Sequence, residues 1–453
     1  QSAQEQTYLA NLLLGSQAYE QALELALHCS ADLSAQIIRR LNDSGFKPAP
    51  ALREIYSRLL ALAGRLPPFE QAARSAPAAL PVAQLTMRGR VNCLTFSPCG
   101  TQLAIGASSR QAAIWDYQRA ALAQSVRGFQ HSVGVAAYSP DGALWLGERG
   151  RSPGAFGLYR FEDGLEKTAD LPAAVVAILP QANGAVWVVA RDAGLTRVQS
   201  NPASSQTFHL PAWPRALAIS PDGAAIAACE RSILLLDSAQ PSIRRRFQVI
   251  SSRYGNIRAG MTSAAAFSAN SDTLMIGQHN GQVIALDGVL IGTRINVRLA
   301  VALRGKVSAL LQDPARQRLI AADAAGQLAF LPAAKGSQPL LLSAPGAGSL
   351  TSLSIHPAGK FLAVGYAQNE WGLWDLRTQD VPDILSAPVG SLPLSAAETI
   401  LTLESSPLLS PALRYWLAYA GLLLRQRFQY DIDIASLPAI KPGSHEILLD
   451  ALD

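Results

Sequence analysis

Short alternating runs of apolar residues follow one another through the middle of the chain, and each ends at turn residues. In the first run, GRVNCLTFSPCG at 89–100, Val91, Leu94 and Phe96 lead to a Ser-Pro-x-Gly corner. Ser-Pro-Asp-Gly corners close comparable runs at 139–142 and 220–223. Alternation with a period of two that stops at Pro and Gly is typical of β-strands joined by tight turns. The pattern predicts a central region made of β-sheet.

The same strand-and-corner segment recurs seven times. Its corner residues lie 40–48 residues apart, at Phe96, Tyr138, Leu179, Ile219, Phe267, Leu311 and Ile355. Each copy continues with a second short apolar strand, a third strand and a more polar fourth strand that leads to the next copy. Four antiparallel strands per unit at this period predict the blades of a β-propeller.

The repeated units resemble the WD-repeat β-propeller family. The segments AAIWD (112–116) and WGLWD (371–375) match the ending of the family's third strand, and FSPCG (96–100) matches its first turn. The Gly-His pair that enters each blade of the family is missing here, so its internal hydrogen-bond network is not expected in most blades. The resemblance implies an all-β, seven-bladed propeller. It also offers an analogy to accessory subunits of multi-protein systems in bacteria.

We expect the propeller to span residues 81–378. The segment PVAQLTM (81–87) precedes the first unit and has the character of a fourth strand, whereas the seventh unit lacks one. We therefore expect 81–87 to complete the seventh blade from the other end of the chain. That closure would leave no open sheet edge where the ring meets itself.

Helical periodicity replaces strand alternation at both ends of the chain. In residues 1–80, apolar residues at i, i+3, i+4 and i+7 predict solenoid-like helices, followed by a linker rich in Pro and Ala. Residues 379–453 predict a C-terminal extension with helices near 395–403 and 411–427. One apolar stripe of the second helix either docks on the rest of the chain or binds a partner. It contains Trp416, Tyr419 and Leu423.

Composition narrows the chemistry that the chain can perform. The 453 residues are 49% hydrophobic with a net charge of +5, so a large core is available and the basic bias is mild. Four scattered cysteines predict free thiols and a cytoplasmic location. The most apolar run, 415–424, is too short to cross a membrane. Because no hydrolase, nucleotide-binding or metal-ligand motif occurs, we expect no catalytic residue, cofactor or metal ion.

Aligning the repeats assigns their loops to two rims of the propeller. Loops that enter a blade or join its second and third strands are rich in Arg, whereas first turns and loops after third strands are rich in Asp. We expect a basic rim that binds partners, with Trp213 and Trp371 as anchors. Its selected cations are Arg90, Arg110, Arg151, Arg191, Arg215, Arg231, Arg258 and Lys306, and the same set includes Arg149 and Arg304. Alternatively, Asp merely favours turns and leaves Arg to the other loops.

These features favour a non-catalytic protein-protein interaction scaffold. We expect a subunit of a larger assembly that engages acidic or amphipathic protein segments through the basic rim and the apolar helical flanks. The alternative is nucleic-acid binding by the same rim, although aromatic residues are not interleaved with its cations. An enzyme with a centre built across blades is the least favoured interpretation.

Overall fold

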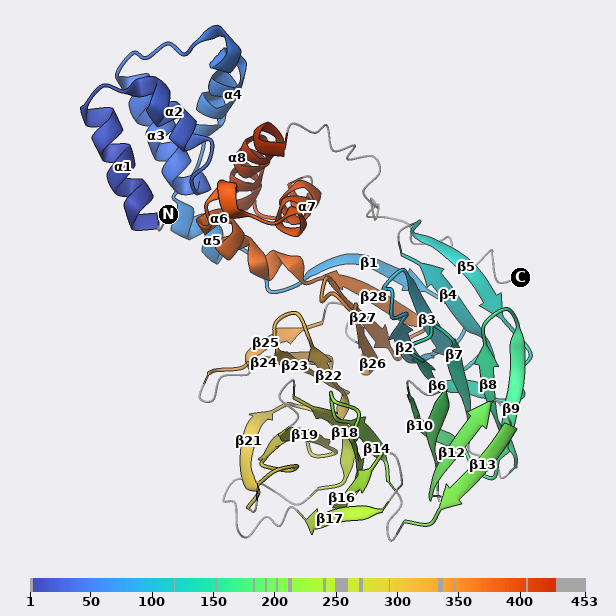
Figure 1. Ribbon diagram of the computed structural model, residues 1–453. Helices are drawn as coiled ribbons and strands as arrows, with labels where there is room; N and C mark the ends of the chain where they lie inside the picture. The colour runs from blue at the N-terminus through green and yellow to red at the C-terminus, as the bar shows by residue number, and fades with distance from the viewer. Residues whose placement is uncertain are drawn as a thin grey trace. The chain divides into compact units, whose positions relative to one another are not determined.

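The computed structural model contains a β-propeller and a set of helices (Figure 1). Within residues 3–428, placement is not described for 118, 151–153, 182–183, 192–193, 201–202, 211–213, 239–241, 249–259, 269–271, 293, 333–336, 345–347 and 405. Residues 81–374 form one compact unit, and the described residues up to 80 and from 375 onward form a second. The fold class predicted from the sequence, a seven-bladed propeller flanked by helices, is confirmed.

Seven four-stranded sheets form the blades, and consecutive strands pair in antiparallel order. The first four blades contain β2 (Val91–Phe96), β3 (Gln102–Ala107), β4 (Ala112–Asp116) and β5 (Ala121–Val126); β6 (Ser132–Tyr138), β7 (Leu144–Arg149), β8 (Phe156–Phe161) and β9 (Leu165–Leu171); β10 (Val175–Pro180), β11 (Ala185–Ala190), β12 (Gly194–Ser200) and β13 (Ala203–Phe208); β14 (Ala216–Ile219), β15 (Ala225–Cys229), β16 (Ser232–Asp237) and β17 (Ile243–Gln248). The last three contain β18 (Thr262–Phe267), β19 (Thr273–Gln278), β20 (Gln282–Asp287) and β21 (Asn296–Ala302); β22 (Val307–Asp313), β23 (Arg318–Asp323), β24 (Gln327–Leu331) and β25 (Leu340–Ser343); β26 (Leu350–Ile355), β27 (Phe361–Tyr366), β28 (Glu370–Asp375) and β1 (Leu80–Thr86).

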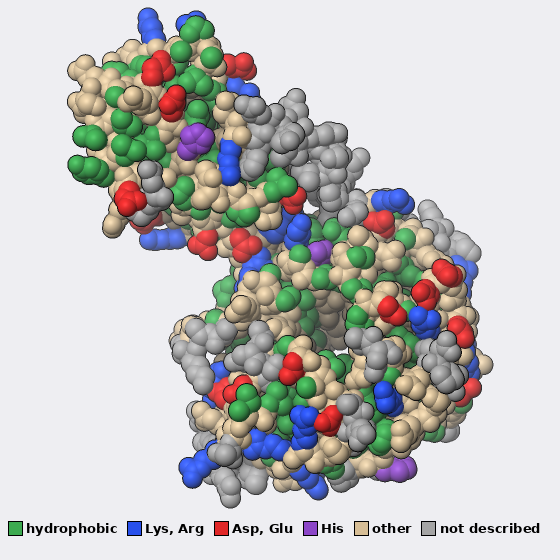
Figure 2. Space-filling model, viewed as in Figure 1, with side chains coloured by type: hydrophobic (Ala, Val, Ile, Leu, Met, Phe, Trp, Pro, Cys, Tyr) green, Lys and Arg blue, Asp and Glu red, His purple; other side chains and the backbone are tan. Residues whose placement is uncertain are grey.

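The first strand of each blade is the innermost one. It contacts the first strands of both neighbouring blades, and β26 of the seventh blade contacts β2 of the first, so the ring closes. The outer strand of the seventh blade is β1, which pairs with β28. A strand from the start of the propeller therefore completes a blade from its end. Figure 2 shows a hollow at the centre of the propeller, where the inner strands surround the axis.

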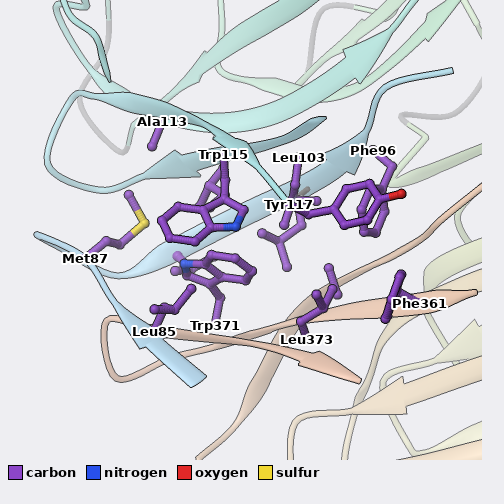
Figure 3. Close-up of a cluster of buried hydrophobic side chains, with 14 of the residues drawn as sticks. Leu85, Met87, Phe96, Leu103, Ala113, Trp115, Tyr117, Phe361, Trp371 and Leu373 are labelled. Atoms are coloured by element: carbon purple, nitrogen blue, oxygen red, sulfur yellow. The ribbon is translucent and has the colours of Figure 1, made fainter. Parts of the chain in front are cut away.

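Large apolar side chains fill the contact between the seventh and first blades, which we call the seam. Trp371 on β28 is fully buried, and its ring meets that of Trp115 on β4 nearly edge-on, with 5.7 Å between centroids (Figure 3). Leu85 and Met87, which belong to β1 and the loop after it, pack in the same cluster. The chain's first and last propeller strands are thus joined by hydrogen bonds and by a shared core.

His356 is a second link across the seam. Its Nδ1 accepts a hydrogen bond from the Ala358 backbone N–H at 3.0 Å, which leaves the proton of the neutral ring on Nε2. That nitrogen lies 3.4 Å from the Tyr117 hydroxyl of the first blade, and the imidazole packs edge-on against Phe96 and Phe361. The side chain is buried, so its role at this corner is structural.

Helices from both ends of the chain form the second compact unit. The N-terminal segment contributes α1 (Ala3–Gly15), α2 (Tyr19–Ala26), α3 (Ala31–Asp43), η1 (Pro50–Leu52), α4 (Arg53–Ala63) and α5 (Phe69–Arg74). The C-terminal segment contributes η3 (Arg377–Asp380), α6 (Val381–Ser386), η4 (Val389–Ser391), α7 (Leu394–Leu403) and α8 (Pro411–Phe428). The expected break between the first two helices falls after Gly15, and Gly45 has the positive φ of +73° that ends α3.

The apolar helix α8 holds this unit together. It packs against α3, α4 and α5 from the N-terminal segment and against α7 from its own segment. The indole N–H of Trp416 donates to the Pro67 carbonyl at 3.1 Å, and the Tyr419 and Ser34 hydroxyls lie 3.0 Å apart. The N-terminal helices therefore bury their apolar faces on a helix that is more than 300 residues away in sequence.

Candidate interaction surface

Strand register brings six basic side chains to one end of the propeller axis. The start of each inner strand pairs with the end of the second strand, as in Ser132↔Arg149, Val175↔Ala190 and Val307↔Asp323. Residues just before an inner strand and at or just after a second strand therefore lie at the same end. We call the set at this end the axial basic ring: Arg90, Arg149, Arg191, Arg215, His279 and Lys306, one from each of the first six blades.

These side chains are exposed and close enough to repel one another. Partial burial lowers the pKa of Arg149, and the positive charges of Arg191 and Arg90 lower it further. Burial also lowers the pKa of Lys306, and Arg149 and Arg215 add to the effect. Arg149 and Lys306 belong to the second and sixth blades, which are not neighbours. Strand register places both of them at the same end of the inner strands, which surround the axis, and the effect of Arg149 on Lys306 agrees with this placement.

His279 joins the ring from the fifth blade. Burial lowers its pKa, and the charges of Lys306 and Arg215 lower it further, which favours the neutral imidazole at neutral pH. The sequence placed Arg149 in the basic set of this rim but not His279. The signal that was available is the repeat alignment, in which both residues lie at the end of a second strand.

Two buried carboxylates organise the loops that carry these cations. Glu148 accepts hydrogen bonds from the backbone N–H groups of Gln130, His131 and Gly157 at 2.6–3.0 Å. Asp323 accepts from the N–H of Gly305 at 2.7 Å, next to Lys306. Both side chains are fully buried. Because backbone donors occupy these two carboxylates, they do not form ion pairs with the ring.

A single glycine gives Arg149 its path toward the axis. A Cβ atom on Gly134 of the inner strand β6 would lie 2.3 Å from the Cβ of Arg149 and 2.8 Å from its Cδ. The arginine stem therefore runs directly over the backbone of β6.

Among the described residues, one carboxylate forms an ion pair with the ring. It belongs to Glu230, which lies 4.0 Å from Arg215.

The other predicted rim residues have different fates. Arg110 and Arg231 are exposed in loops between second and third strands, farther out along their blades. Arg151, Trp213 and Arg258 lie outside the described residues. Trp371 is fully buried in the seam, so its predicted role as a surface anchor is wrong. Trp371 comes soon after the loop between β27 and β28, but it belongs to β28, and its side chain packs against the first blade.

The predicted partner-binding stripe of the C-terminal helix is also corrected. Trp416, Tyr419 and Leu423 are 0–1% exposed because the N-terminal helices cover them. The docking alternative accounts for the stripe, and these side chains offer no free surface. The large apolar residues that are exposed in the described helices are instead Tyr8, Leu12, Leu394 and Tyr415, and Leu408 is exposed in the turn between α7 and α8.

Aspartates at the ends of third strands pair with nearby arginines. Asp375 accepts from the Arg377 guanidinium at 2.6 Å, Asp237 from Arg244 at 2.5 Å, and Asp287 from Arg298 at 3.4 Å. These carboxylates stabilise turns, as the sequence suggested. Within the described residues no group of three His, Cys, Asp or Glu side chains is placed to hold a metal ion, and no helix is long and apolar enough to cross a membrane.

We predict that Cys99 is the reactive thiol of the described chain. It is exposed at the first turn of the first blade, where hydrogen bonds with Ser97 and Thr101 lower its pKa to about 7. Burial raises the pKa of Cys29, Cys93 and Cys229 to about 12. Iodoacetamide at pH 7.5 should therefore alkylate Cys99 first, as measured by peptide mass spectrometry, and the rate should rise through pH 7. Ser97→Ala should move that inflection upward; equal labelling of all four cysteines would contradict the prediction.

Comparison with known proteins agrees with this fold. Residues 81–116, from β1 to β4, match the family model of the WD domain, G-beta repeat. This stretch is similar to a WD repeat. The repeat predicted from the sequence corresponds to one blade, whereas the matched stretch spans two, because it begins with the outer strand of the seventh blade and continues through three strands of the first. No curated protein sequence matches the chain.

Solved structures share the propeller at low sequence identity. The β-propeller domain of Cps50 (Swd1) from Myceliophteria thermophila is 14% identical with a TM-score of 0.54; the match covers 66% of this chain and 99% of that one. A chain of a mitotic checkpoint complex is 16% identical with a TM-score of 0.54, over 65% of this chain and 91% of that one. At these identities the likeness concerns the fold alone, which is the β-propeller.

Proposed function

We propose that this protein is a non-catalytic interaction scaffold, a propeller subunit of a larger assembly that binds acidic protein segments at its axial basic ring. The similar solved chains support this role, since one of them was solved as part of the mitotic checkpoint complex. The aspartates that could suggest catalysis pair with nearby arginines and support turns. The apolar residues Tyr8 and Leu12, one helical turn apart on α1, supply an exposed flank of the kind that an amphipathic segment would contact.

The observation that carries the proposal is the excess of positive charge in the ring: among the described residues its five fixed cations form one ion pair, between Arg215 and Glu230. Four arginines and a lysine approach one axis, while the buried carboxylates beside them are held by backbone N–H groups. Holding like charges together is unfavourable unless an anion neutralises them, and arginine binds carboxylates through two parallel hydrogen bonds. An acidic segment would gain both a long-range attraction and specific contacts.

We predict that a fluorescent peptide of ten glutamates binds the wild-type protein and that Arg90→Glu/Arg215→Glu weakens binding at least tenfold. Each substitution replaces attraction by repulsion at the ring. Fluorescence anisotropy in 100 mM salt measures both affinities. The control Arg119→Glu/Arg246→Glu makes the same change in net charge at exposed positions outside the ring and should leave affinity within about twofold.

The same titration tests nucleic acid as the ligand. If a 20-base-pair DNA duplex binds more tightly than the peptide and the affinity falls steeply with salt, the scaffold proposal gives way to nucleic-acid binding. If the ring variant and the control variant lose the same affinity, the contact depends on net charge alone and the ring is not the site.

A further inference from the structure

The cations of the axial basic ring are arranged around one end of the propeller axis rather than along a groove. Its residues come from six different blades, all at the same end of the inner two strands. Electrostatic effects connect Arg149 of the second blade with Lys306 of the sixth, and Lys306 with Arg215 of the fourth. Both pairs join blades that are not neighbours. Strand register places the residues of the ring at the same end of the inner strands, which surround the axis, so a ligand bound there has cations on several sides.

The chemistry of the ring favours phosphate. Four of its five fixed cations are arginines, whose planar guanidinium groups bind phosphate oxygens in pairs, and the lysine adds a point charge. His279 lies beside Lys306 and Arg215 and could donate a hydrogen bond from the neutral ring. An acidic peptide carries one carboxylate per residue along an extended chain, so it would contact only some of these groups. Several phosphates on a small frame would reach most of them.

The surroundings leave the ring open to such a ligand. The carboxylates of Glu148 and Asp323 are turned into the protein and occupied by backbone N–H groups. Glu230 approaches Arg215 only at 4.0 Å. No carboxylate among the described residues therefore neutralises Arg90, Arg149, Arg191 or Lys306 through an ion pair.

We infer that the axial basic ring binds a free, compact polyphosphate, with phosphate groups that point outward from a small central frame. The inference uses the same ring as the proposed function and adds a ligand class to it. A duplex presents its phosphates along one line, which fits a groove better than a ring around an axis, whereas an acidic protein segment would contact part of the ring. The polyphosphate would relieve the mutual repulsion of the cations and would stabilise the folded propeller.

Inositol hexakisphosphate is a suitable probe because it carries six phosphates around one small ring. Calorimetric titration in 150 mM salt should show binding to the wild-type protein, and its thermal midpoint should rise with ligand concentration. Arg149→Gln/Lys306→Gln should weaken binding at least tenfold. The control Arg110→Gln/Arg231→Gln removes the same charge from the same rim, farther from the axis, and should change the affinity by less than about twofold.

The possible outcomes separate this inference from the proposed function. If the wild-type protein binds the glutamate peptide but not inositol hexakisphosphate, the polyphosphate inference is wrong and the scaffold proposal stands. If both ligands bind and the phosphate ligand displaces the peptide, they share the ring as expected. Equal weakening in the two double variants would place the phosphate site elsewhere. A decapeptide with three neighbouring phosphoserines could bind more tightly than inositol hexakisphosphate. That result would overturn the inference of a free polyphosphate and would indicate a phosphorylated protein partner.

Discussion

Trp371→Ala should destabilise the propeller by about 3–5 kcal/mol, because it removes a fully buried indole and leaves a cavity. The loss falls at the seam, where Trp371 packs against Trp115 in the cluster that also contains Leu85 and Met87. This cluster connects the last blade to the first, so a defect there weakens the closure of the ring. Urea unfolding followed by circular dichroism measures the change in the free energy of unfolding.

Two further variants make the Trp371 result specific. The indole N–H of Trp371 has no hydrogen-bond partner, so Trp371→Phe should keep most of the packing without losing a hydrogen bond and should cost less than half as much. Tyr8→Ala removes an aromatic ring that is 73% exposed on α1 and should change the urea midpoint little. A loss in Trp371→Ala no larger than that in Tyr8→Ala would show that the seam does not limit stability.

Asp313→Ala should also cost about 3–5 kcal/mol, since it removes a fully buried carboxylate from two arginines whose side chains are only 12–15% exposed. The Asp313 carboxylate is fully buried and accepts from Arg318 Nε at 3.0 Å and from Arg316 Nη1 at 3.4 Å. Arg316 also donates to the Gly359 carbonyl of the seventh blade at 2.9 Å. Breaking this network exposes two uncompensated charges and loosens the contact between the sixth and seventh blades. The same urea titration measures the loss.

Asp222→Ala is the matched control for Asp313→Ala. Asp313 is the last residue of the inner strand β22, and Asp222 lies in the turn after the inner strand β14. Asp222 is exposed and accepts from the Ser220 hydroxyl and the Ala224 N–H of its own turn. Its removal should have a much smaller effect, because water replaces the lost contacts. Similar losses in the two variants would mean that Asp313 acts only as a turn residue, which is how its position in the repeat was interpreted.

The local arrangement of strands within each blade follows from the amino-acid sequence alone. Alternation with a period of two specifies which strand residues share a face, and the corners at Ser-Pro-Asp-Gly set the ends of strands, so seven blades could be counted before the fold was seen. The family resemblance was visible for the same local reason, because Trp115 and Trp374 each precede an aspartate at the end of a third strand. The helix near 411–427 was visible because its apolar residues recur with helical period, and it is α8 in the structure.

Contacts between side chains that are far apart in the sequence could not be predicted and are seen only in the folded structure. Trp371 and Asp313 have the sequence context of loop and turn residues, yet ring closure brings a neighbouring blade over each of them. The stripe of Trp416 and Tyr419 is covered by helices more than 300 residues earlier in the chain. Repeat alignment could gather the basic residues on one rim, but their convergence on the axis depends on blades that are not adjacent. The period of the apolar residues specifies local hydrogen bonding and which residues share one face of a strand or helix. The contacts of Trp371, Asp313 and the α8 stripe form only after distant segments pack together.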